Sequence, residues 1–267
     1  MARITVDDVH FFYTAQGPAS ALQPALVLLH GSGGDSSVWH AQIEALADAR
    51  RVIAVDLPGH GQSGGKTAAC AEHYAHWLKL LTEALKLPPF VLAGHSMGGS
   101  IAQQFAHIYP EALTGLILAG TGLRFEIPAG YRKLLRQNFD EACMVSCQQA
   151  YAGPMTADVI ERGRAMLLRN GPDVLARDLD LCAGFDSTAW AKNLALPCLI
   201  LCGAQDAITP CALSQRLADA IPVSTLRCVE AAGHMVMQEQ PDLFNREISG
   251  FMAHLCRENP SAEKNNR

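Results

Sequence analysis

The chain has 267 residues, enough for one domain with a large buried core. Hydrophobic residues make up 49% of it and charged residues 18%, which excludes an intrinsically disordered chain. Its formal net charge of -5, without any run of Lys or Arg, gives no support to binding of nucleic acid or of an anionic membrane.

The first residues predict a soluble, cytoplasmic protein. Asp7 and Asp8 lie where a signal peptide would need its apolar stretch, and no apolar run approaches the roughly 20 residues of a membrane span. The nine cysteines include no Cys-x-x-Cys pair and no histidines at zinc-ligand spacing. We therefore expect reduced, buried cysteines and no metal site.

In chain order, the opening RITVDDVHFFYTAQG has two β-like runs and predicts an antiparallel hairpin at a sheet edge. Six runs rich in Val, Ile, Leu and Ala follow, as in parallel strands covered on both faces; they span 25–30, 52–57, 90–95, 113–120, 197–203 and 224–230. Helical patterns alternate with them over 39–48, 69–86, 97–109, 210–220 and 240–255. This alternation predicts an α/β fold, with a mostly parallel central sheet flanked by helices.

One interval, from 121 to 190, contains no buried-strand run. It is helical in pattern, with breaks at Pro128, Gly153-Pro154 and Gly171-Pro172, and it is too long for a crossover and too apolar for a loop. We predict a helical cap insertion over 121–190, a core formed by 1–120 and 191–256, and a polar C-terminal tail over 257–267.

The stretch GHSMGG, residues 94–99, joins a predicted strand to a predicted helix. Its pattern G-x-S-x-G is typical of a sharp turn that projects a serine oxygen from the carboxyl end of a strand, and Ser96 is the candidate nucleophile. A phosphate-binding loop is excluded because no Gly-Lys-Ser/Thr follows.

A serine nucleophile requires a base and an orienting carboxylate. Asp206 and His234 each follow a predicted strand, and the chain order Ser, Asp, His fits such a triad. Asp56 precedes the nucleophile and is expected to shape a loop, whereas Asp186 is expected to cap a helix.

The same chemistry requires an oxyanion hole, which is a pair of backbone N–H groups directed at the developing negative charge. Met97 directly follows the serine and is the first predicted donor. The loop HGSGG after the strand at 25–30 provides the second, with Ser32 preferred and Gly33 as the alternative.

The motifs HGSGG, DLPGHGQSGG, GHSMGG, GAQDAITP and AAGHMV, in this order, resemble the signatures of the α/β-hydrolase superfamily, in its branch with a helical cap. The resemblance covers nearly the whole chain and is weakest in 121–190. Haloalkane dehalogenases and epoxide hydrolases, relatives with an aspartate nucleophile, differ at the position of Ser96. The resemblance implies a serine hydrolase, with a carboxylesterase preferred, that needs no metal or organic cofactor.

The expected partner is a small ester. The predicted cap has eight basic and nine acidic residues, so it offers no net field to attract a charged substrate and favours a neutral one. The same triad also serves carbon–carbon bond hydrolases, lactonases, thioesterases and acyltransferases. A ligand-sensing receptor with slow turnover is the alternative from another class of function.

Overall fold

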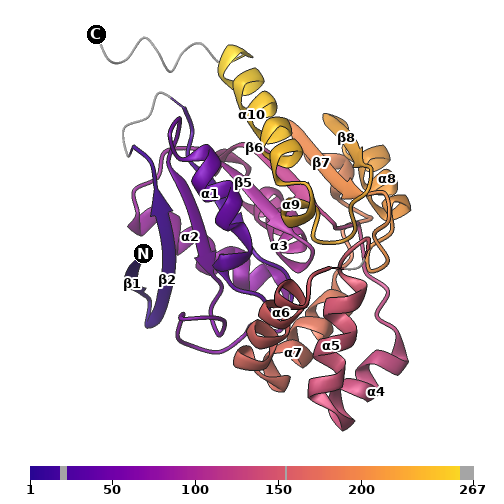
Figure 1. Cartoon of the computed structure of the whole chain (residues 1–267). Helices are drawn as coiled ribbons and strands as arrows, with labels where there is room; N and C mark the ends of the chain where they lie inside the picture. The colour runs from indigo at the N-terminus through magenta and orange to yellow at the C-terminus, as the bar shows by residue number, and fades with distance from the viewer. Residues whose placement is uncertain (19–22, 154, 259–267) are drawn as a thin grey trace.

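The computed structural model describes residues 1–18, 23–153 and 155–258. A sheet of eight strands forms its centre, in the order β1-β2-β4-β3-β5-β6-β7-β8 (Figure 1). The strands are β1 (Ala2–Val6), β2 (Val9–Gln16), β3 (Leu26–Leu29), β4 (Val52–Asp56), β5 (Phe90–His95), β6 (Leu113–Ala119), β7 (Cys198–Gly203) and β8 (Ser224–Val229). β2 runs antiparallel to β1 and β4, which confirms the predicted edge hairpin, and the remaining pairs are parallel.

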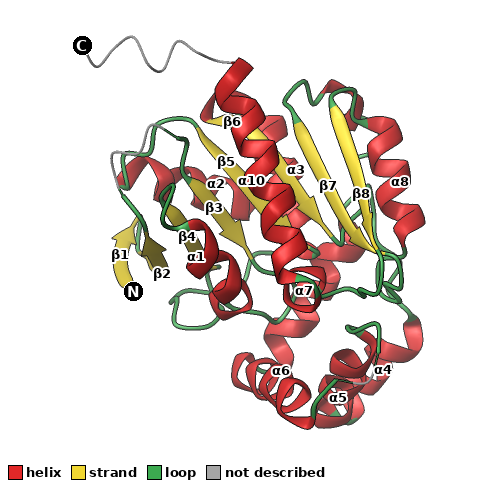
Figure 2. Ribbon diagram, turned by 45° about the horizontal axis from the view of Figure 1, so that its top comes forward, coloured by secondary structure: helices red, strands yellow, loops and turns green. Residues whose placement is uncertain are grey.

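Helices cover both faces of the sheet, and α10 crosses one of these faces (Figure 2). The α-helices are α1 (His40–Leu46), α2 (Ala71–Ala84), α3 (Met97–Ile108), α4 (Ala129–Gln137), α5 (Phe139–Gln149), α6 (Ala157–Asn170), α7 (Pro172–Gly184), α8 (Cys211–Ala220), α9 (Val236–Glu239) and α10 (Pro241–Glu258). Short 3-10 helices occur at η1 (Ser36–Trp39), η2 (Pro110–Ala112) and η3 (Ala191–Asn193).

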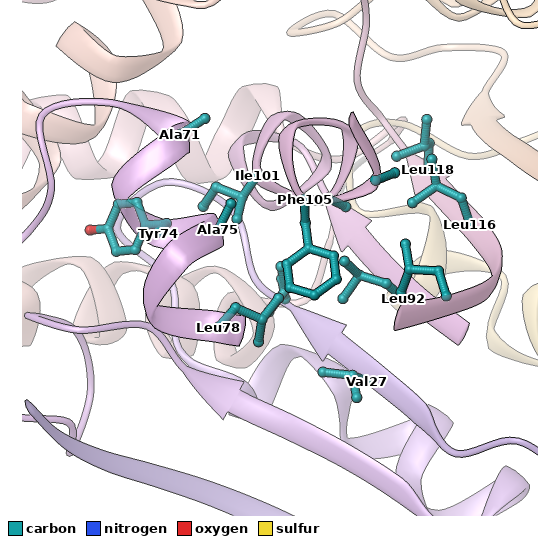
Figure 3. Packing of buried hydrophobic residues seen from close by; sticks show 14 of the residues in the cluster. Val27, Ala71, Tyr74, Ala75, Leu78, Leu92, Ile101, Phe105, Leu116 and Leu118 are labelled. Carbon is teal, nitrogen blue, oxygen red and sulfur yellow. The ribbon is translucent and has the colours of Figure 1, made fainter. Parts of the chain in front are cut away.

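Side chains on each inner strand alternate between two hydrophobic clusters. In β3, Val27 and Leu29 join the cluster that contains α2, α3 and α8, whereas Leu26 and Leu28 join the cluster that contains α1, α9 and α10. Figure 3 shows part of the first cluster, where side chains of α2 and α3 meet those of β3, β5 and β6. Burial on both faces explains why these strands read as continuous apolar runs.

Four helices, α4 to α7, fill the interval between β6 and β7, where the sequence contains no buried-strand run. We refer to residues 121–190 as the helical segment. Its helices lie together beyond the carboxyl ends of the parallel strands (Figures 1 and 2). Pro128 is the N-cap of α4 and Pro172 begins α7, in agreement with two of the expected breaks, whereas Pro154 lies outside the described residues.

The C-terminal boundary differs from the prediction. α10 continues to Glu258, so residues 257 and 258 are helical, and the rest of the predicted tail, 259–267, lies outside the described residues. Phe244, Ile248, Met252 and Leu255 repeat at helical spacing and bury one face of α10, which stabilises the helix close to its end. Within the described ranges, no helix combines the length and the apolar character needed to cross a membrane.

Candidate active site

Ser96 lies at the turn between β5 and α3 and has a left-handed backbone, with φ 53° and ψ −119°. This conformation is uncommon for a residue with a side chain and is typical of functional turns. The turn also requires the two glycines of the motif, because backbone atoms approach them too closely to leave room for a Cβ atom. A Cβ atom on Gly94 would lie 2.1 Å from the carbonyl oxygen of Gly98, and one on Gly98 would lie 2.5 Å from that of His30.

Asp206 and His234 form a buried pair. Asp206 follows β7, His234 follows β8, and Nδ1 of His234 lies 2.8 Å from Oδ2 of Asp206. The other carboxylate oxygen accepts backbone N–H groups from Ile208 and Thr209 at 2.8 and 2.7 Å. The Thr209 hydroxyl donates to Oδ2 of Asp206 at 2.8 Å, so both carboxylate oxygens are satisfied.

These contacts keep the aspartate ionised. Burial alone would raise the pKa of Asp206, but the charge of His234 and the donors of His234 and Thr209 together outweigh burial and lower it. An ionised carboxylate at Nδ1 holds the proton of His234 on that nitrogen, which leaves Nε2 as the acceptor.

Ser96 and His234 line the same cavity, which has a volume of about 1740 Å³. Its wall combines the carboxyl ends of the strands with the helical segment, from which Tyr131, Tyr151 and Met166 contribute. No hydrogen bond joins Ser96 to His234 within the described part of the chain, and such bonds are often long before substrate binds.

The two rival carboxylates have other partners. Asp56 accepts the backbone N–H groups of Ser36 and Gln62, both at 2.8 Å, and so joins two loops. Asp186 accepts the N–H of Thr188 at 2.8 Å and pairs through its backbone with Arg124. Of the three carboxylates considered, only Asp206 contacts His234.

Of the predicted oxyanion donors, Met97 directly follows Ser96, and Ser32 lines the same cavity as Ser96. Within the described residues, the backbone N–H groups of Ser32 and Met97 have no hydrogen-bond acceptor, as a hole that awaits substrate requires. The N–H of Gly33, in contrast, donates to Oδ2 of Asp178 at 2.7 Å. This bond occupies the alternative donor, so we retain Ser32.

Asp178 connects the helical segment to the core and was not among the residues predicted from sequence. It lies on α7, is fully buried, and also accepts from Nε2 of His60 at 2.9 Å. Burial alone would lower the pKa of His60, but the charge and hydrogen bond of Asp178, the carbonyl of Pro58 and the charge of Asp56 together outweigh burial and raise it. The other ring nitrogen of His60 faces the carbonyl oxygen of Pro58 at 3.3 Å, an arrangement that suits a protonated ring.

A second contact ties the helical segment to the same loop. The side-chain amide of Asn170, the last residue of α6, donates to the carbonyl oxygens of Gly33 and Gly34 at 2.8 and 2.9 Å. Its oxygen accepts the N–H of Gly61 at 2.8 Å. Asn170 and Asp178 therefore fix the loop that carries Ser32.

Two buried histidines hold the backbone next to the site residues by hydrogen bonds. His30 accepts the N–H of Leu57 at Nε2, at 3.0 Å, and donates from Nδ1 to the carbonyl oxygen of Gly31 at 2.8 Å. Nε2 of His95 donates to the carbonyl oxygen of His234 at 3.0 Å. Burial lowers the pKa of His30 to about 4 and that of His95 to about 3, so both rings are neutral.

The sequence does contain signals for the roles of Asp178 as a buried carboxylate and of Thr209 as a partner of Asp206. On α7, Leu175, Leu181 and Cys182 lie three or four residues from Asp178, so its carboxylate interrupts an apolar face and must be buried. Thr209 follows Asp206 by three residues in the loop after β7, within reach of the carboxylate.

The central sheet, with Ser96, Asp206 and His234 gathered beyond the carboxyl ends of its parallel strands, defines a hydrolase. Residues 26–247 match the model of the alpha/beta hydrolase family, and the chain belongs to that family.

Similar proteins cover most of the chain. The putative 2-succinyl-6-hydroxy-2,4-cyclohexadiene-1-carboxylate synthase of Bacillus subtilis is 32% identical, over 94% of this chain and 98% of that protein. The pimeloyl-[acyl-carrier protein] methyl ester esterase of Aeromonas hydrophila is 32% identical, over 86% and 95%. The solved structure of a thermophilic esterase from Thermogutta terrifontis is 30% identical and superimposes with a TM-score of 0.83, covering 95% of this chain and 98% of that one.

Proposed function

We propose that this protein is a serine hydrolase that cleaves small, neutral carboxylic esters through an acyl-enzyme. The observation that carries the proposal is the strained turn at Ser96, which opens into the same cavity as a histidine held by a buried carboxylate. The esterases among the similar proteins add support for ester bonds as substrates.

In the proposed reaction, Nε2 of His234 takes the proton from Ser96 as the serine oxygen attacks the ester carbonyl carbon. The N–H groups of Ser32 and Met97 stabilise the oxyanion that forms on the carbonyl oxygen. His234 then gives its proton to the leaving alcohol. Water, deprotonated by His234, attacks the acyl-enzyme and releases the acid, which regenerates Ser96.

The preference for neutral substrates follows from the pairing of cationic side chains in the helical segment. Four of its eight cationic side chains form ion pairs, namely Arg132 with Asp180, Arg162 with Asp158, Arg164 with Asp140 and Glu161, and Arg169 with Asp35. They include Arg162 and Arg169, the cationic residues of this segment that line the cavity. A paired guanidinium has little field left to attract an anion. We expect kcat/KM to favour a neutral ester over its carboxylate-bearing analogue and to depend little on salt.

The test has two parts. An alkyl phosphonate should label Ser96 covalently, and Ser96→Ala should lose on the order of 10³-fold or more in kcat while it keeps its fold. A label on another residue, or a fully active Ser96→Ala enzyme, would contradict the assignment of the nucleophile.

A substrate panel then separates the reactions that this triad can perform. Neutral esters, lactones, thioesters and dienone acids are assayed with the wild type and with Ser96→Ala. Highest kcat/KM on a lactone, a thioester or a carbon–carbon bond would replace the ester in the proposal. Turnover far below about 1 s⁻¹ on every substrate would favour a ligand sensor.

An anionic substrate would point to Arg216. This exposed residue of α8 lines the cavity and forms no ion pair within the described residues. A tenfold preference for the carboxylate-bearing ester that disappears in Arg216→Gln would identify that guanidinium as a substrate clamp.

A further inference from the structure

Three cysteines that are distant in sequence converge on one face of the sheet. Cys202 on β7 and Cys228 on β8 are register partners in the parallel ladder, so their side chains point to the same face. Cys211 is the first residue of α8, which covers that face. Its sulfur lies 2.8 Å from that of Cys202 and 3.1 Å from that of Cys228.

The cluster has the chemistry of a soft-metal site. All three sulfur atoms lie within 4.8 Å of one another, and no histidine or carboxylate of the described residues belongs to the group. Cys202 is buried, Cys211 is half-buried and Cys228 is exposed, so the sulfurs form a short path inward from solvent. Thiolate ligands select Cu(I) and Zn(II) over harder ions such as Mg²⁺ or Ca²⁺.

We propose that Cys202, Cys211 and Cys228 bind one thiophilic metal ion, Cu(I) or Zn(II), at a site separate from the active site. Metal–sulfur bonds of about 2.3 Å would place the sulfurs roughly 3.8 Å apart in a tetrahedral arrangement. The sulfur–sulfur separations of 2.8 and 3.1 Å require these sulfurs to spread by about 1 Å at most, and solvent at Cys228 can provide a fourth ligand to Zn(II).

Cys202 and Cys228 are thiols until a metal displaces their protons. Burial raises the pKa of Cys202 and of Cys228, and contact with Cys211 raises both further. A disulfide is a weaker explanation of the cluster because it would join only two of the sulfurs and would require an oxidant. A metal ion uses all three.

Metal binding would act through the backbone on Asp206, the carboxylate that holds His234. Cys202 and Cys211 bracket residues 203–210, the end of β7 and the loop after it, which carry Asp206 and Thr209. A shared metal would therefore fix both ends of this loop and link them to β8. The site lies on the α8 side of the sheet and does not depend on the proposed ester chemistry.

The test uses the full chain, reduced and metal-free, titrated under anaerobic conditions with Zn(II) and, separately, Cu(I) against a chromophoric chelator. We expect one equivalent of one of these ions per chain, and protection of the three cysteines from iodoacetamide, mapped by mass spectrometry. Hydrogen exchange in 203–210 should slow in the metal-loaded protein. At a hundredfold excess of metal over Kd, Tm should rise by about 6 °C.

Cys211→Ser and Cys228→Ser should each weaken binding by at least about 100-fold, because each removes a direct ligand. Both positions are partly open to solvent, so the fold should tolerate serine. The matched control is Cys256→Ser, on α10, which should bind like the wild type. Absence of stoichiometric binding, or unchanged binding by either cluster variant, would overturn the site. Metal binding without slower hydrogen exchange in residues 203–210 would overturn the proposed effect on the segment that carries Asp206.

Discussion

The buried contact between the helical segment and the core can be tested by Asp178→Ala. The substitution removes the acceptor of two hydrogen bonds, one from the N–H of Gly33 and one from the ring of His60. Both donors are buried, and water does not readily replace the carboxylate. The change therefore affects both the stability of the protein and the position of the loop that carries Ser32, the proposed oxyanion loop.

The expected loss of stability is about 3 kcal/mol. A buried donor left without a partner costs roughly 1–3 kcal/mol, and breaking a buried ion pair costs about 3–5 kcal/mol. His60 can release its proton after the loss of Asp178 and so avoid a buried unpaired charge. The expected loss of stability therefore lies at the lower end of the range of about 3–5 kcal/mol for a broken ion pair. For a protein of this size, Tm should fall by about 6–12 °C.

Activity should fall as well. Displacement of a catalytic group by about 1 Å can cost on the order of 10²-fold, so we expect kcat/KM on an ester to decrease about tenfold to a hundredfold. The matched control is Asp180→Ala, two residues further along α7, whose side chain is 65% exposed and pairs with Arg132. An exposed ion pair contributes at most about 1 kcal/mol.

The assays are urea unfolding followed by circular dichroism, and initial-rate kinetics on a neutral ester. The reasoning is refuted if Asp178→Ala unfolds within about 0.5 kcal/mol of Asp180→Ala and retains wild-type kcat/KM.

The pair also has a pH signature. The pKa of His60 is raised in the folded protein above its ordinary value of 6.5, so the folded state binds a proton that the unfolded state loses. The resulting stability is fully present below pH 6.5 and is lost as pH rises through the raised pKa. The difference in unfolding free energy between wild type and Asp178→Asn should therefore shrink over that window; a constant difference would mean that His60 is not charged.

Three further outcomes are expected. Ser96→Gly should be inactive but about 1 kcal/mol more stable than Ser96→Ala, because only glycine adopts a positive φ without strain; equal stability in urea would contradict this. Asp206→Asn should lower kcat by about 10⁴-fold, whereas Asp186→Asn should stay within roughly tenfold of wild type, and reversed results would exchange their roles. Burial lowers the pKa of His30 to about 4 and that of His95 to about 3 in the folded protein. Below pH 6.5, each ring therefore stays neutral in the folded state, down to its own pKa, but takes up a proton in the unfolded state. The free energy of unfolding should thus fall as pH drops from 6.5 to 4, by about 3 kcal/mol from His30 alone; a flat profile in urea titrations would argue against burial of neutral rings.

The sheet could be predicted from sequence because its strands are covered on both faces and therefore read as short apolar runs. β3 is an example, since all four of its residues are buried. The G-x-S-x-G turn could be predicted because its motif lies within five residues, and Gly94 is required by a local contact with the backbone of Gly98. Each signal is contained in a few neighbouring residues.

What escaped prediction depends on contacts between distant segments. Asp178 meets Gly33 across 145 positions of the chain, and no local pattern specifies which loop a buried carboxylate will reach. The expectation that all cysteines are buried was wrong for four of the nine, of which Cys228 is exposed. Cys228 lies on β8, an edge strand that has a neighbouring strand on one side only. Most residues of β8 are not buried, so its apolar pattern is weak.

The bonds from Asn170 and Asp178 to Gly33 also limit how freely this protein can exchange parts with its relatives. A helical segment transplanted from another family member would bring its own pocket lining, and where it lacked side chains equivalent to Asn170 and Asp178 it would lose these bonds. The recipient would then have a new specificity above a loosened oxyanion loop. Chimeras that retain Asn170 and Asp178 should accordingly keep a higher kcat than those that exchange 121–190 entirely.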